Sequence, residues 1–136
     1  MRFILLLSLL VTAGCTLSPR DKAQLAQRQA TDQEQLDEAL AGLTPGKPQA
    51  CLNALRRNFN TKRIGDTILY VASRDLIYRT DTTGGCSTAR PDDILITSTP
   101  QPSVCRGDIV RTVQPTIFVN TGSCGLGDFI PYERKK

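Results

Sequence analysis

Residues 64–72 read IGDTILYVA, and residues 75–80 follow as DLIYRT. Both segments are rich in β-branched and aromatic residues and are bounded by residues that favour turns. Similar segments recur at residues 94–98 (ILITS), 108–113 (DIVRTV) and 116–120 (TIFVN). Because no helical pattern alternates with them, crossover helices for a parallel sheet are missing. The sequence therefore predicts an all-β fold, a small antiparallel barrel or sandwich of about five to six strands.

The length of 136 residues fits one compact domain with a tail, and the charge is divided unevenly along the chain. Residues 16–44 hold three basic and five acidic residues, whereas residues 45–136 hold thirteen basic and eight acidic residues. A basic domain favours anionic surfaces. Because no basic stripe is interleaved with stacking aromatics, we expect no nucleic-acid partner.

The first fifteen residues have the pattern of an export signal. A basic start precedes an apolar stretch at residues 3–11 (FILLLSLLV), and small residues then lead directly to Cys15. The stretch is too short for a membrane-spanning helix, which needs about 20 apolar residues. The small residues before Cys15 resemble the lipobox of bacterial lipoproteins. This predicts a signal peptide over residues 1–14 and lipidation of the Cys15 thiol by palmitate-type chains.

The cysteine count agrees with a lipidated Cys15. Assigning that thiol to lipid leaves an even set in an exported chain, which an oxidising compartment would pair into two disulfides: Cys51, Cys86, Cys105 and Cys124. Plain secretion, the alternative, leaves Cys15 as an odd thiol. In many lipoproteins an Asp after the lipidated cysteine retains the protein at the inner membrane. Because Thr16 stands there, we expect the outer membrane, with the domain facing the periplasm.

The geometry of a predicted hairpin favours one pairing of the four cysteines. If residues 114–115 form a two-residue turn, the register places Cys105 opposite Cys124. Opposed side chains in a hairpin lie about 4.5–5.5 Å apart at Cβ, near the distance that a disulfide needs. This predicts Cys105 paired with Cys124 and Cys51 paired with Cys86, with the two other connectivities left open.

Between the signal and the strands, Ser18 and Pro19 have the pattern of an N-cap and the first residue of a helix. The helical pattern continues to Leu40 and ends near Gly42. Its apolar stripe is too narrow for a coiled coil, which favours a solvated spacer over docking to a partner helix or self-association.

Residues 44–48 (TPGKP) contain two prolines and a glycine, which break a helix and mark a boundary. The predicted organisation is a signal peptide, then a lipidated cysteine with a helical linker over residues 15–48, then a disulfide-braced β domain over residues 49–136.

Several motifs near the C-terminus resemble a known family. The run at residues 123–131 (SCGLGDFIP), the segment at residues 105–110 (CRGDIV) and the segment at residues 67–70 (TILY) are similar to a proteobacterial family of small exported four-cysteine proteins and lipoproteins, a domain of unknown function. The resemblance covers about residues 50–132. It implies an exported β domain and carries no activity and no catalytic residues.

Candidate chemistry is sparse. The sequence has no histidine, which excludes the common serine triads and removes the usual general base near neutral pH. Adjacent strand residues point to opposite faces, so Asp92 and Asp93 would not converge, and we expect them to serve a turn or strand entry. With the four cysteines paired, zinc also lacks ligands, so we expect no metal site and no cofactor. Asp66 and Asp108 keep a small carboxylate-dependent hydrolase open as an alternative.

The densest basic cluster comprises Arg56, Arg57, Lys62 and Arg63. Such a cluster is either a solvated face or a contact with anionic envelope material. The tripeptide at residues 106–108 (RGD) is too short to indicate adhesion, and its glycine fits a bulge. The glycines at positions 122, 125 and 127 indicate a tight turn that closes the barrel.

Taken together, these patterns predict a lipid-anchored protein of the cell envelope that acts as a non-enzymatic binding or structural module. Its expected partners are the membrane, through the lipid, and an envelope protein or an anionic surface component. Besides the hydrolase, a small-ligand carrier is the other alternative, and it requires an apolar pocket of roughly several hundred Å³ inside the barrel.

Overall fold

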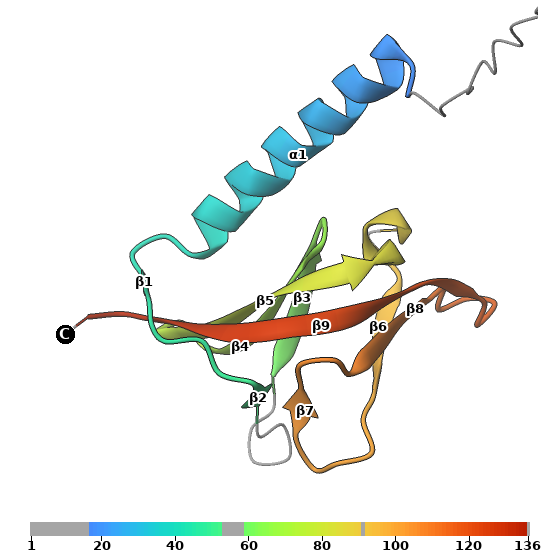
Figure 1. Ribbon diagram of the computed structural model, residues 1–136. Helices are drawn as coiled ribbons and strands as arrows, with labels where there is room; N and C mark the ends of the chain where they lie inside the picture. Colours follow the sequence, from blue (N-terminus) through green and yellow to red (C-terminus); the bar gives the residue numbers. More distant parts are fainter. Residues whose placement is uncertain (1–16, 53–58, 91, 136) are drawn as a thin grey trace, which may run out of the picture.

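The computed structural model of the protein describes residues 17–52, 59–90 and 92–135. A strongly curled antiparallel sheet forms a half-barrel with the strand order β3-β4-β5-β9-β8-β6, which confirms the predicted all-β class (Figure 1). A short strand, β1, adds to β9, and β2 pairs with β7 beside the main sheet. The elements are α1 (Pro19–Ala39), β1 (Thr44–Pro45), β2 (Cys51–Leu52), β3 (Asn60–Ile64), β4 (Thr67–Ser73), β5 (Leu76–Gly84), the short 3₁₀ helix η2 (Gly85–Thr88), β6 (Ile94–Ser98), β7 (Val104–Cys105), β8 (Ile109–Val113) and β9 (Asn120–Glu133).

Strand β4 is buried on both faces. Ile68 and Tyr70 pack inside the half-barrel, whereas Leu69 packs on the outer face beneath α1. Both faces of this strand therefore require apolar side chains, which explains the continuous apolar run in the sequence. The expectation of one strand over residues 64–72 is wrong, because Gly65 adopts a positive φ of 56° and turns the chain between β3 and β4.

Aromatic side chains fill the inside of the half-barrel. Phe59 contacts the rings of Tyr70 and Tyr78 edge-on, and Tyr70 contacts Phe129, with centroids 5.7–6.0 Å apart. Burial raises the pKa of the Tyr70 hydroxyl, and a side-chain hydrogen bond with Thr97 opposes that rise. Since Tyr70 is on β4 and Thr97 on β6, the curl brings together strands that lie far apart in the sheet order. The described aromatic side chains thus pack together inside the half-barrel.

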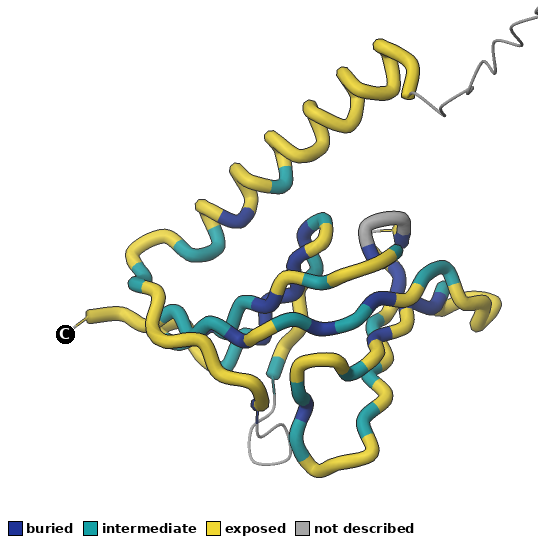
Figure 2. The backbone as a smooth tube through the Cα atoms, in the orientation of Figure 1, coloured by how far each residue is buried: buried dark blue, intermediate teal, exposed yellow. Residues whose placement is uncertain are grey.

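Helix α1 begins and ends as predicted. The Ser18 hydroxyl accepts a hydrogen bond from the Asp21 amide, Pro19 is the first helical residue, and Gly42 takes a positive φ of 72° just after the helix. Only its C-terminal part is anchored, through Leu36, in an apolar cluster with residues of β3, β4 and β5 (Figure 2). Within the described residues no helix is both long and apolar enough to cross a membrane.

The proline-containing segment after α1 belongs to the sheet. Thr44 and Pro45 pair with the C-terminal end of β9, and Gln49 makes an isolated bridge to Phe129. The Gly46 amide also donates to the Pro131 carbonyl. The segment after α1 is therefore hydrogen-bonded to the sheet, which fixes the position of the C-terminal end of α1 relative to the half-barrel.

Strand β9 spans 14 residues and crosses the middle of the sheet between β5 and β8. The prediction that glycines 122, 125 and 127 form a closing turn is wrong, because all three lie within this strand. Gly127 has no room for a side chain, since a Cβ there would overlap the Asp81 carbonyl across the β5–β9 bulge. The prediction of a strand at residues 116–120 is also wrong: residues 114–119 form the loop between β8 and β9, and β9 begins at Asn120.

The predicted disulfide pairing is wrong, although all four cysteines are bridged. The bonds join Cys51 to Cys105 and Cys86 to Cys124. The β8–β9 connection has six residues rather than two, so Val110 takes the place opposite Cys124. On its other side Cys124 pairs with Gly84 of β5, which brings Cys86 within reach, and Cys105 leaves the main sheet to pair with Cys51 of β2.

Candidate functional site

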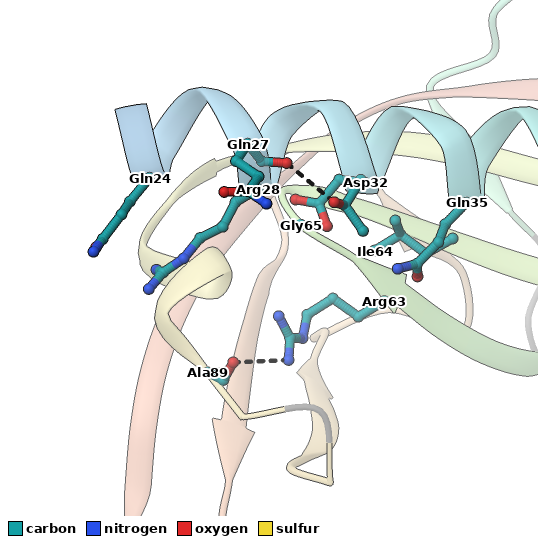
Figure 3. Close-up of a pocket in the computed structure, with 10 residues that line it drawn as sticks. Gln24, Gln27, Arg28, Asp32, Gln35, Arg63, Ile64, Gly65 and Ala89 are labelled. Carbon is teal, nitrogen blue, oxygen red and sulfur yellow. Dashed lines mark hydrogen bonds between the residues drawn. The ribbon is translucent and has the colours of Figure 1, made fainter. Parts of the chain in front are cut away.

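A polar groove of about 630 Å³ lies between the middle of α1 and the edge of the half-barrel (Figure 3). We call it the α1 groove. One wall comes from a single face of the helix and the other from β3, the turn after it and the end of η2. The lining residues are Gln24, Gln27, Arg28, Thr31, Asp32, Gln35, Arg63, Ile64, Gly65 and Ala89.

The groove exists because α1 touches the sheet at one end only. Leu36 docks in the outer apolar cluster, and the helix then continues over the β3–β4 turn. Gly65 in that turn lies so close to the Asp32 carboxylate that a Cβ at this position would overlap it. The positive φ of Gly65 is the stronger reason for glycine here, because the Asp32 carboxylate is the end of a flexible side chain and can turn aside.

Arg63 forms the floor of the groove and is held by backbone carbonyls. Its guanidinium donates hydrogen bonds to the carbonyl oxygens of Cys86, Ala89 and Arg90 at 2.6–3.1 Å, one of them drawn in Figure 3. These bonds tie β3 to the chain after the Cys86 disulfide. The acceptors are neutral dipoles, and among the described residues Arg63 forms no ion pair with a carboxylate.

Polar side chains of α1 are left free to bind. In the part of the chain that the structure describes, the side chains of Gln24, Arg28 and Gln35 have no hydrogen-bond or ion-pair partner, whereas the Thr31 hydroxyl donates to the Gln27 carbonyl. The charged groups that line the groove are the guanidinium groups of Arg28 and Arg63 and one carboxylate, that of Asp32. The groove therefore offers amide donors and acceptors with an excess of positive charge, which suits a polar ligand of net negative charge.

The basic cluster predicted from the sequence is divided by the structure. Arg56 and Arg57 lie outside the described residues. Lys62 is exposed on β3, whereas its neighbour Arg63 is half-buried and engaged with carbonyls. Cys15, the predicted lipidation site, also lies outside the described residues.

The two carboxylates of the alternative hydrolase come from different turns of the sheet. Asp66 lies in the β3–β4 turn, where its carbonyl accepts hydrogen bonds from Thr82. Asp108 precedes β8, and its carboxylate accepts a hydrogen bond from the Cys105 amide at 2.8 Å. Neither side chain lines the α1 groove. Within the described ranges no group of three or more cysteine, aspartate or glutamate side chains is placed to hold a metal ion.

Asp93 has the turn role that the sequence predicts. Its carboxylate accepts hydrogen bonds from the Arg90 amide and the Thr121 hydroxyl, which joins the entry of β6 to the start of β9. These hydrogen bonds, that of Thr121 above all, hold the pKa of the carboxyl below its ordinary value of 3.8. Asp93 is therefore a structural anion.

The Arg-Gly-Asp tripeptide is used within the fold. Arg106 forms an ion pair with Asp128 of β9 at 3.0 Å, and the Asp108 carboxylate caps the backbone of Cys105. Gly107 turns the chain between β7 and β8 with a φ of 89°. Both charged side chains thus have intramolecular partners.

Compared with models of known protein families, with curated proteins and with solved structures, the chain matches none. The family resemblance drawn from the cysteine motifs therefore stays a prediction.

Proposed function

We propose that the protein is an envelope lipoprotein, tethered by Cys15 to the outer membrane, whose β domain is a non-enzymatic binding module. The observation that carries the binding proposal is the α1 groove, in which free amide groups and the free guanidinium of Arg28 lie along one face of α1, opposite the carbonyl-bound Arg63 of β3. The two disulfides are compatible with an oxidising compartment outside the cytoplasm.

The chemistry of the groove favours an acidic polymer of the cell wall as the ligand. Three glutamines and a threonine supply hydrogen-bonding groups of both kinds, which suits the hydroxyl and amide groups of a glycan strand and its peptides. Arg28 adds a charged donor for a carboxylate. We therefore propose peptidoglycan as the envelope component that the groove binds.

Reversing the charge at Arg28 tests this ligand. We expect Arg28→Glu to weaken co-sedimentation of the detergent-extracted full chain with purified sacculi by about ten-fold or more, because a hydrogen bond to a charged group contributes about 1.5–3 kcal/mol. Bound protein is measured at increasing protein concentration and at two salt concentrations.

The matched control is Lys22→Glu, which makes the same change in net charge on the same helix at a residue that does not line the groove. Retained binding of this variant supports the proposal. Equal loss in both variants would assign the binding to general charge, and full binding by Arg28→Glu would exclude the groove.

The anchor is tested separately by Cys15→Ser. We expect this variant to leave the membrane fraction and appear in the soluble periplasmic fraction, since stable attachment requires the acyl chains. Fractionation and metabolic labelling with a radioactive fatty acid measure the effect. A Cys15→Ser chain that stays in the membrane without label would contradict the lipid anchor.

A further inference from the structure

The loop between β8 and β9 exposes three consecutive apolar side chains. Ile117, Phe118 and Val119 are 61%, 76% and 52% exposed, and we call them the apolar tip. Scattered exposed apolar residues are ordinary on a soluble protein, but a contiguous group at the end of a hairpin indicates contact with an apolar partner. The other large exposed apolar residues of the half-barrel lie close by in the sheet.

The loop has a defined shape. The Gln114 amide donates to the Val119 carbonyl, and the Phe118 amide donates to the Gln114 carbonyl. Phe118 adopts a φ of 53°, which bulky side chains rarely take, and is the one residue other than glycine in the described part of the chain with a positive φ. Such a conformation persists only where the surrounding structure stabilises it. The hydrogen bonds of the loop therefore hold Phe118 with its ring exposed to solvent.

An apolar face continues from the tip onto the sheet. Ile94 and Ile96 of β6 and Ile109 of β8 are each more than two-fifths exposed, and their neighbours Leu95 and Val110 point into the half-barrel. Ile94 pairs with Val113, the last residue before the loop, so the face and the tip are contiguous. Helix α1 packs on the outer side of β3, β4 and β5 and leaves this face uncovered (Figure 2).

Charge selects the partner. Residues 109–127 contain no acidic residue and one basic residue, Arg111, which is exposed on the apolar face. The acidic residues next to this face in the sequence are Asp92, Asp93 and Asp108; Asp92 is exposed, whereas the carboxylates of the other two accept hydrogen bonds within the fold. Apolar side chains beside a cation are the composition with which proteins enter the interface of an anionic bilayer. An aromatic ring at the end of the tip suits the headgroup region.

The position of the helix agrees with a lipid surface. The N-terminal end of α1 and the β8–β9 loop lie toward the same side of the molecule, on the right in Figure 1, whereas the C-terminal end of β9 lies on the opposite side. Pro19, the first helical residue, follows Cys15 by four positions. We propose that the apolar tip inserts into the same bilayer that holds the lipid anchor, so that the domain is fixed at two points; this step rests on the proposed anchoring through Cys15.

A single tryptophan reports the insertion, because the sequence contains none. The Phe118→Trp variant of the lipidated full chain is reconstituted in vesicles of phosphatidylethanolamine and phosphatidylglycerol, with or without dibrominated phospholipid. We expect a blue-shifted emission maximum and loss of most of the emission when brominated lipid is present. The matched control is Arg74→Trp, in the exposed turn between β4 and β5 at the opposite end of the sheet, whose emission stays unshifted and unquenched.

Unquenched emission from both variants would overturn the proposal, as would equal quenching of both. A blue shift of the Phe118→Trp variant that appears only after envelope proteins are added would also overturn it, in favour of a protein partner. If the chain proves to carry no lipid, the vesicles are added to the Phe118→Trp variant in solution. Quenching of its indole emission then supports membrane insertion of the apolar tip, even though the lipid anchor at Cys15 is contradicted.

Discussion

Replacing Cys86 and Cys124 together with alanine lowers the free energy of unfolding by about 2–5 kcal/mol, the range for native disulfides of small secreted domains. Both cysteines are buried in the inner apolar cluster, and their bond joins η2, directly after β5, to β9. A domain of this size has only about 5–15 kcal/mol in total. We therefore expect the urea concentration at the midpoint of unfolding to fall strongly, as measured by circular dichroism without reductant.

The matched control is the Cys51→Ala/Cys105→Ala variant, which removes the other disulfide. The two bonds close loops of 54 and 38 residues, and that difference changes the loop entropy by only about 0.3 kcal/mol, in favour of the longer loop. Burial decides instead: Cys51 is exposed and joins a two-stranded piece beside the main sheet. We expect the smaller loss here, and a larger one would contradict the central role given to the Cys86–Cys124 bond.

Phe129→Ala lowers the free energy of unfolding by about 3–5 kcal/mol, because the ring is lost and a cavity is left behind. Phe129 is fully buried on β9, and its ring meets that of Tyr70 edge-on at 5.7 Å. Its backbone also bridges to Gln49, which ties the segment after α1 to the sheet. Urea unfolding measures the loss, with an unchanged slope as evidence that the two-state transition is retained.

Phe118→Ala is the control for Phe129→Ala, since it makes the same chemical change at an exposed position. We expect the free energy of unfolding to change by no more than about 0.5 kcal/mol. If truncation of Phe118 destabilised the domain as strongly as truncation of Phe129, the apolar tip would be part of the core and would not be available for a membrane.

The α1 groove and the apolar tip could not be predicted from the sequence, for two different reasons. The polar side chains along α1 have the composition of a solvated face, and they become one wall of a groove only because Leu36 docks the helix over the β3–β4 turn. Residues 116–120 have the β-branched composition of a buried strand. A proline at position 115 and the positive φ of Phe118 place residues 116–119 in a loop instead. An apolar run that leaves the core is the signal of a contact surface.

Local chemistry let the sequence by itself determine the start of α1 and the strand at residues 94–98. A serine N-cap followed by proline specifies a helix start within a few residues. A short run rich in β-branched residues between turn formers likewise specifies β6. The all-β class follows from the same local signals repeated along the chain.

Only the tertiary structure decided which cysteines pair and where the chain turns. The partner of Cys124 depends on the length of the β8–β9 loop, because each added loop residue shifts the register of the whole hairpin. The glycines of β9 show the same dependence: in the sequence they indicate a turn, yet Gly127 is needed inside a strand because the Asp81 carbonyl approaches it across the sheet. Register and close approach are properties of two strands together, so neither segment alone contains them.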